Sequence, residues 1–209
     1  ATGTVALANN QALSLKSLSA DSVVLRTSAG NLMVDADITI TRQALLEAGA
    51  GGSVSVGEDI TLSVAQGALS LQAAQGIHLG AGSLVTSQGS MDMQATAGAL
   101  TMSPSARIAS GGGNILLTAG TNINLSTVDA RRAGGSVNTL GSRIGVLAGG
   151  SITNVLATDA TGANLYGADA LLQAGTGMGG DSGASALRLA LTRVSAHTSS
   201  GDIRLYALG

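Results

Sequence analysis

Two aspartates occupy matching positions in two similar stretches of sequence, Asp37 in DADITI and Asp59 in GEDITL. They are 22 residues apart, which would stack them on adjacent coils of a repeating fold. Two facing carboxylates can perform acid–base chemistry on a glycoside or bind a hard cation such as calcium. Alternatively, both are turn residues that lead into a strand, where Asp tolerates unusual backbone angles. Asn122 precedes a similar triplet in GTNINL, which favours the turn interpretation.

Aromatic side chains often line ligand sites, and the chain has two Tyr, no Phe and no Trp. We expect any ligand-binding position near Tyr166, in a loop that projects from the fold. His78 and His197 are far apart and match no metal-binding spacing, so both are expected to face solvent. No catalytic residue, cofactor or metal site is predicted. The candidate ligand-binding residues are Tyr166, Asp37 and Asp59.

Short triplets with apolar residues at their first and third positions recur about every 23 residues. One column of triplets comprises Leu32/Val34, Val54/Val56, Ile77/Leu79, Leu100/Met102 and Ile123/Leu125. A second column comprises Leu45, Leu69/Leu71, Met91/Met93, Ile115/Leu117 and Val137. A period of two is that of a β-strand whose outer residues point inward and whose middle residue points to solvent. Each triplet therefore predicts a short strand.

A third, weaker column comprises Ile38/Ile40, Ile60/Leu62, Leu84 and Ile108. Three such strands per repeat predict an all-β fold, a right-handed parallel β-helix with about three short strands per coil of roughly 22–24 residues. Gly67, Gly89, Gly113 and Gly135 precede successive strands and are expected at one recurrent corner, where the backbone turns tightly. Residues 1–140 are predicted to form regular coils. Residues 141–209 are predicted to continue the β-helix less regularly, with a projecting loop around 157–186.

The composition limits the function further. The chain has 209 residues, 31 Gly, a single Pro and no Cys, and its net charge is −2. Such a charge does not favour nucleic acid as a partner, no apolar run is long enough for a membrane span, and disulfides are excluded. The chain lacks an initiating Met and a signal peptide, so we expect it to be a piece of a longer protein.

The phrases IASGGGNILLTAGTNINLSTVDA and VSAHTSSGDIRLYA resemble the repeats of filamentous-haemagglutinin-like adhesins. The stretch LLQAGTGMGGDSGASALRLALTRVSAHTSSGDI also looks like one common in such exoproteins. The resemblance implies an internal repeat segment of a very large bacterial protein that is secreted or displayed on the cell surface. It also implies two-partner secretion, with an outer-membrane secretion partner for the parent protein.

We therefore expect a structural and adhesive shaft segment without enzymatic activity. Its expected role is attachment to host cells, surfaces or biofilm matrix, with host-cell or matrix glycans and proteins as possible partners. The open strands at the ends of a cut β-helix also predict end-to-end self-association. The alternative is a carbohydrate-active β-helix enzyme of the polysaccharide lyase or hydrolase type, or a glycan-binding module on the same fold.

Overall fold

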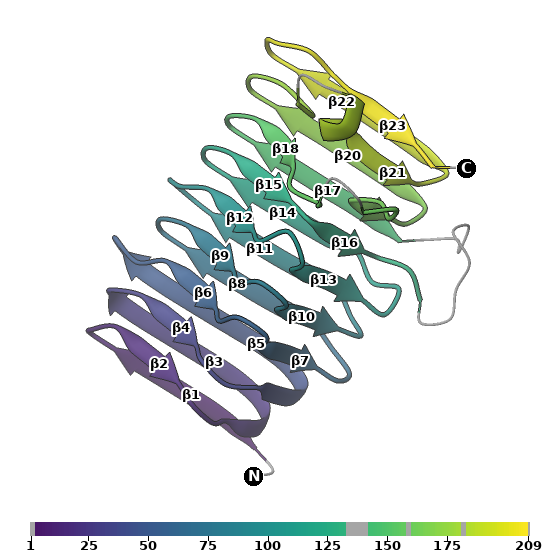
Figure 1. The fold of residues 1–209 in the computed structure, drawn as a ribbon. Helices are drawn as coiled ribbons and strands as arrows, with labels where there is room; N and C mark the ends of the chain where they lie inside the picture. The colour runs from purple at the N-terminus through teal and green to yellow at the C-terminus, as the bar shows by residue number, and fades with distance from the viewer. Residues whose placement is uncertain (1–2, 133–141, 158–159, 181–182, 209) are drawn as a thin grey trace.

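The computed structural model describes residues 3–132, 142–157, 160–180 and 183–208. The chain folds as a parallel β-solenoid, and the described residues contain no α-helix. Short strands stack coil upon coil from the N-terminus at one end to the C-terminus at the other (Figure 1). Every strand pair is parallel, and the strands form three faces, here called A, B and C.

Face A contains the longest strands. Its members are β1 (Thr4–Asn9), β3 (Ser19–Ala29), the second half of β5 (Ile38–Ala50), β8 (Leu69–Ala73), β11 (Met91–Ala95), β14 (Ile115–Ala119), β17 (Arg143–Ala148), β20 (Asp169–Ala174) and β22 (Arg193–Thr198). In face A, each of these strands pairs with its equivalent on the next coil, so equivalent side chains form rows along the stack.

Faces B and C complete each coil. Face B contains the first half of β5, then β7 (Thr61–Val64), β10 (Leu84–Ser87), β13 (Arg107–Ser110), β16 (Thr127–Asp129), β19 (Leu165–Tyr166), β21 (Leu187–Ala190) and β23 (Leu205–Ala207). Face C contains β2 (Leu13–Leu15), β4 (Leu32–Val34), β6 (Val54–Val56), β9 (Ile77–Leu79), β12 (Leu100–Met102), β15 (Ile123–Leu125) and β18 (Ile152–Asn154). The seven strands of face C form a separate sheet.

Faces A and B are joined into one 16-stranded sheet because β5 runs through the corner between them. Its first residues pair with β7 on face B, and its later residues pair with β8 on face A. Strand β3 takes the same course and has a register shift between Ala20 and Ser22. An extra residue at such a point bends a strand, which allows the chain to turn the corner without ending the strand.

The predicted column of face C is confirmed. Leu32 lies opposite Val54, Val54 opposite Ile77, Ile77 opposite Leu100, and Leu100 opposite Ile123. All five side chains are buried, and the residues between them on each strand point outward. The interior is a stack of aliphatic ladders, which explains how the chain forms a core almost without aromatic residues.

The second column is wrong at Leu45. On β5 the inward-facing residues are Ala44 and Leu46, which are buried, whereas Leu45 is half-buried and lies opposite the outward-facing Ser70. Three consecutive apolar residues hide the phase of a period-two pattern, so the sequence alone could not decide which of them points inward. The last member of that column, Val137, lies outside the described residues.

The recurrent glycine corner is present at Gly67, Gly89 and Gly113, whereas Gly135 lies outside the described residues. A Cβ atom at Gly113 would lie 2.3 Å from the Gly89 carbonyl oxygen, and one at Gly89 would lie 2.7 Å from that of Gly67. None of these three glycines has a positive φ. Glycine is therefore required here for the close approach of successive backbones rather than for an unusual backbone angle.

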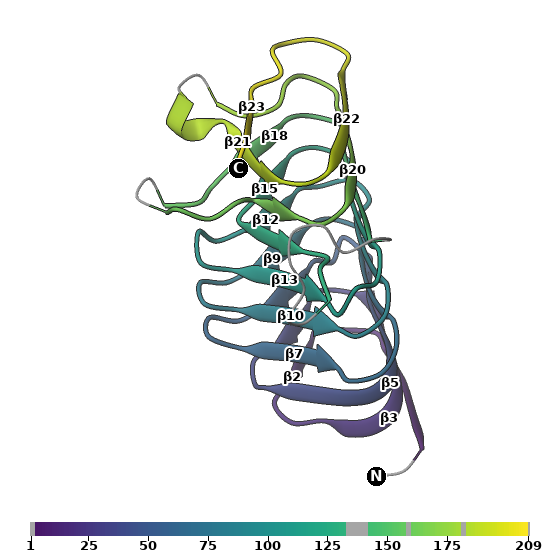
Figure 2. The same ribbon diagram turned by 90° about the vertical axis from the view of Figure 1, so that its right-hand side faces the viewer.

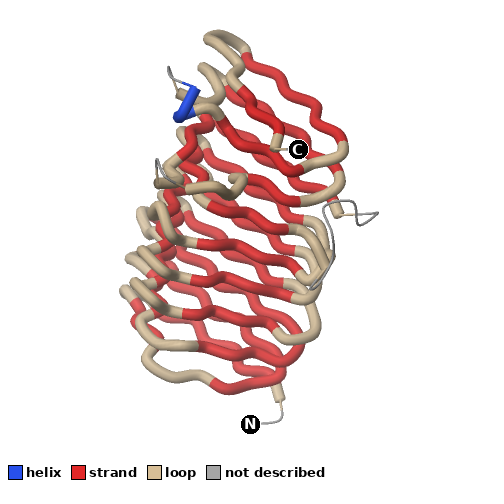
Figure 3. Tube along the Cα trace, turned by 45° about the vertical axis from the view of Figure 1, so that its right-hand side comes forward, coloured by secondary structure: helices blue, strands red, loops and turns tan. Residues whose placement is uncertain are grey.

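The segment 157–186, for which a projecting loop is predicted, contains β19, β20 and the short 3₁₀-helix η1 (Gly183–Ser185) in its described part. Strand β19 stacks between β16 and β21 and is therefore part of a coil, whereas η1 lies beside the stacked strands (Figures 2 and 3). The fully buried Asn164 donates hydrogen bonds to the Leu125 and Ser126 carbonyls and accepts one from the Arg188 amide. This side chain connects coils on both sides of it.

Candidate functional site

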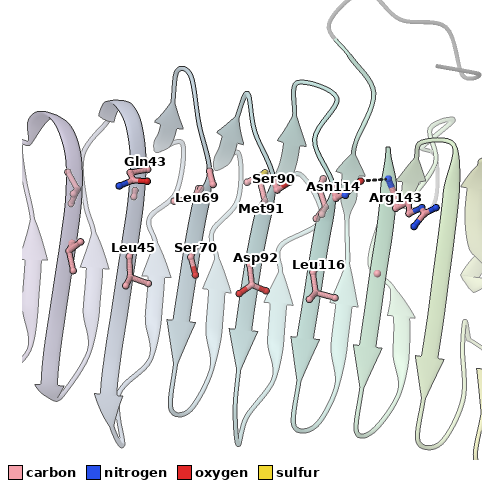
Figure 4. Close-up of a pocket in the computed structure, with 16 residues that line it drawn as sticks. Gln43, Leu45, Leu69, Ser70, Ser90, Met91, Asp92, Asn114, Leu116 and Arg143 are labelled. Atoms are coloured by element: carbon pink, nitrogen blue, oxygen red, sulfur yellow. Dashed lines mark hydrogen bonds between the residues drawn. The ribbon is translucent and has the colours of Figure 1, made fainter. Parts of the chain in front are cut away.

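The outer surface of face A contains a groove with a volume of about 690 Å³, here called the face A groove. It runs across β3, β5, β8, β11, β14 and β17, and its surface is mainly apolar. With neighbouring strands about 4.8 Å apart, six strands give it a length of roughly 24 Å. The residues labelled in Figure 4 are Gln43, Leu45, Leu69, Ser70, Ser90, Met91, Asp92, Asn114, Leu116 and Arg143.

One outward-facing row of side chains follows the groove along its length. Along the stack this row comprises Val24, Leu45, Ser70, Asp92, Leu116 and Gly145. In this row the larger Leu45 and Leu116 flank the smaller Ser70 and Asp92, and all six residues line the groove (Figure 4). The register of the solenoid thus turns a size pattern in distant triplets into a continuous surface feature.

Leu116 is 41% exposed and lines the groove. Its Cδ1 atom lies over Gly145 on the next coil, because a Cβ built at Gly145 would be only 2.8 Å from it. The absence of a side chain at position 145 therefore gives Leu116 the space to lean along the stack axis. An exposed leucine in this position offers apolar surface to whatever occupies the groove.

Asp92 is the one carboxylate among the residues that line the groove. Among the described residues it has no hydrogen-bond or ion-pair partner for its carboxylate, although it is half-buried. Burial raises the pKa of Asp92, because the apolar surroundings disfavour its charged form. An unpaired and partly desolvated carboxylate interacts more strongly with a nearby positive charge than one in open water does.

Tyr166 lies in strand β19 of face B and not in a projecting loop. Its hydroxyl oxygen accepts a hydrogen bond from the Ala163 amide at 2.8 Å. The Arg131 guanidinium stacks on its ring, 4.1 Å from the ring centroid. Because the hydroxyl is bonded and one side of the ring is covered, Tyr166 holds its own coil in place rather than presenting a free ring to a ligand.

The stacked guanidinium of Arg131 also binds Asp129. It donates two hydrogen bonds to the Asp129 carboxylate, at 2.9 and 2.8 Å, and Arg107 donates a third at 2.8 Å. Burial raises the pKa of Asp129, but the hydrogen bonds from Arg131 and the positive charges of Arg131 and Arg107 outweigh it, so the pKa is lowered from its ordinary value. Asp129, Arg131, Arg107 and Tyr166 thus form a satisfied structural cluster.

The two aspartates in similar phrases do not face each other. The register between β5 and β7 is 24 residues, so Thr61 rather than Asp59 lies opposite Asp37. The Asp37 carboxylate accepts a hydrogen bond from the Thr61 amide at 2.7 Å. Asp59 has a positive φ of 55°, typical of a turn residue. These positions favour the turn interpretation. The spacing of 22 residues was not a reliable guide, because the register between neighbouring coils differs from face to face: it is 22 residues between Leu32 and Val54 but 24 between Ile38 and Leu62.

The described residues contain no group of three or more His, Cys, Asp or Glu side chains that could hold a metal ion. His78 and His197 both have exposed side chains, as expected. Within the described ranges, no helix is long and apolar enough to cross a membrane.

The face A groove was not predicted from the sequence. Its signals are two apolar residues at outward positions of face A, Leu45 and Leu116, and the small residues between them. They become informative once the register shows that they belong to one row. Comparisons of the chain with family models, curated proteins and solved structures found no match.

Proposed function

We propose that the chain is a structural and adhesive shaft segment of a large secreted or surface-exposed bacterial adhesin. The observation that carries the proposal is the in-register stacking of three faces around continuous aliphatic ladders. The strands of each coil pair with those of the next, so the solenoid forms a rod that can be extended by adding coils. A rod of this kind holds binding surfaces away from a cell and displays side-chain rows along its sides.

The two end coils support the shaft proposal. Leu7 on β1 occupies an inward position opposite Leu25 but is 46% exposed. At the other end Val194 is opposite Ala170 and is 44% exposed, and Ile203 is 42% exposed. Such inward-facing apolar residues are suited to contact with a further coil, from the same chain or from a second molecule. End-to-end self-association is therefore part of the proposal.

The first test is an immunoblot of the source organism's cell-surface, soluble and medium fractions, with antibody raised against the purified chain. The proposal predicts a band far larger than the 20.2 kDa of this chain, on the surface or in the medium. Beads coated with the chain should also adhere to host cells or to biofilm matrix more than beads coated with albumin. A band of the chain's own size confined to the cell interior would contradict the proposal.

The second candidate is a glycan-binding module or carbohydrate-active enzyme, and the face A groove is the observation that favours it. Glycoside hydrolysis by the common mechanism uses two carboxylates, whereas Asp92 is the single carboxylate among the groove's lining residues. We therefore rank glycan binding above cleavage for this candidate. A panel of polysaccharides, assayed for both retention on the immobilised chain and release of reducing ends, distinguishes the two activities.

A further inference from the structure

We propose that the face A groove binds organic cations that have an elongated apolar body, with the cationic group beside Asp92 and the apolar body along the row of Leu45 and Val24. This proposal concerns the surface of the rod and is independent of the shaft proposal. The chemical class that it names is a primary alkylammonium group, whether it belongs to a free amine or to a longer molecule.

The shape of the groove favours an elongated ligand. Its floor is the outward surface of parallel strands, and it extends along the stack axis rather than into the core (Figure 4). From Asp92, the row continues over Ser70 to Leu45, two strands or about 10 Å away, and then to Val24. Leu116 adjoins Asp92 on the opposite side. An apolar chain lying in this row would cover side chains that are now partly exposed to water.

One carboxylate and one guanidinium line the groove, and the part of it around Asp92 favours a cationic group. The strands that pair with β11, which are β8 and β14, carry no titratable side chain. Strand β9, which also packs against β11, carries His78, whose side chain faces solvent on face C. The other charged lining residue is Arg143, two strands from Asp92. It lies opposite Asp169, whose carboxylate binds Arg193.

A cation beside Asp92 would replace the favourable interactions with water that this carboxylate loses through partial burial. The apolar walls exclude part of the water that would solvate the charge, and no described protein group replaces it. An ammonium group supplies three hydrogen-bond donors and an opposite charge in the same position. An anionic ligand with the same apolar chain would instead be repelled by Asp92, so the charge of the ligand discriminates between related molecules.

The test is calorimetric titration of the full chain with n-octylammonium at pH 7. The comparison ligands are 1-octanol, which differs only in the head group, and octanoate, an anion of nearly the same length. We expect saturable binding of n-octylammonium and weaker binding of the other two. Asp92→Asn keeps the size of the side chain and removes its charge, and it should weaken n-octylammonium binding about five- to tenfold. It should leave 1-octanol binding unchanged. Glu58→Gln, at an exposed carboxylate outside the groove, is the matched control and should bind like the wild type.

A pH series distinguishes the contribution of the Asp92 charge to affinity from that of apolar contacts. Between pH 7 and pH 4 the octylammonium group stays protonated, so a loss of affinity on acidification reports the protonation of Asp92. The raised pKa of Asp92 places this loss above the range of an ordinary aspartate. Asp92→Asn should show no such loss.

Four results would overturn the proposal. The first is the absence of saturable n-octylammonium binding. The second is equal affinity of wild type and Asp92→Asn for n-octylammonium. The third is octanoate binding as tight as n-octylammonium binding. The fourth is a dimer, detected by sedimentation, whose formation excludes the ligand, because the groove would then be the contact surface of a second copy.

Discussion

Tyr166 of β19 lies in register with Asp129 of β16 on the neighbouring coil, and Arg131 connects the two. Arg131 donates to the Asp129 carboxylate at 2.8 Å and stacks on the Tyr166 ring at 4.1 Å from its centroid. The two coils are separated in sequence by a stretch that departs from the 22–24 residue repeat, since Asn164 bonds to a residue 38 positions before it. The Asp129–Arg131–Tyr166 contact therefore fastens the coils where the repeat is longest.

Removing the charge of Asp129 should destabilise the solenoid. Its carboxylate is 7% exposed and is bound by both Arg131 and Arg107. Asp129→Asn would leave the half-buried Arg131 guanidinium without its counter-charge, at an expected cost of about 2–4 kcal/mol in the free energy of unfolding. Urea denaturation followed by circular dichroism measures this cost. Asp202→Asn breaks an exposed pair with Arg204 and should cost about 0.5 kcal/mol or less. Equal costs for the two variants would contradict the structural role of Asp129.

Asp129 also predicts how the stability depends on pH. Because the pKa of Asp129 in the folded protein is lower than its ordinary value of 3.8, the unfolded chain binds a proton more readily than the folded one. The stabilisation is fully present above the unfolded pKa and is lost as the pH falls through the folded pKa. Thermal melts between pH 7 and pH 2 should show wild type and Asp129→Asn converging at the acid end. A constant difference between them would show that the carboxylate charge is not the cause.

Two neighbouring leucines on β14 test the register of face A. Leu117 is fully buried and Leu116 is 41% exposed, so the same substitution samples the inside and the outside of one strand. Leu117→Ala should reduce the free energy of unfolding by about 3 kcal/mol, because it removes core contacts and leaves a cavity. Leu116→Ala should change it by less than about 1 kcal/mol. Chemical denaturation of both variants measures the difference, and a larger effect at Leu116 would reverse the assigned register.

The corner glycines predict a contrast between two kinds of glycine. At Gly113 an added Cβ would meet the Gly89 carbonyl at 2.3 Å, and backbone must move to relieve the contact. At Gly51 an added Cβ would meet nothing within 4 Å, but φ is +70°. Gly51→Ala should therefore cost about 1–2 kcal/mol from backbone strain alone. Gly113→Ala should cost more than Gly51→Ala in denaturation experiments. The opposite order would mean that the coils can separate at this corner without loss of pairing.

The sequence by itself determined the architecture of this protein, because the information needed for it is local. A period of two, repeated about every 23 residues and punctuated by glycines, is compatible with stacked parallel strands and not with helices. The ladder from Leu32 to Ile123 follows from this pattern, since every triplet in it has apolar residues at both inward positions, and four of the five have a polar residue between them that fixes the phase.

Tertiary structure decided which side chains from different coils are neighbours on the surface. The number of residues per coil varies along the chain, from 18 between Thr4 and Ser22 to 37 between Val128 and Leu165. A one-residue change in register moves a side chain to the other face, and a two-residue change gives it a different neighbour. This is why Asp37 lies opposite Thr61 rather than Asp59, and why Leu45 points outward. Leu45, Asp92 and Leu116 lie in one row only because three successive strand pairings each have a particular register. Each register is set by backbone pairing between coils. The aliphatic repeat specifies the rod, and the exact stacking of its coils specifies the groove.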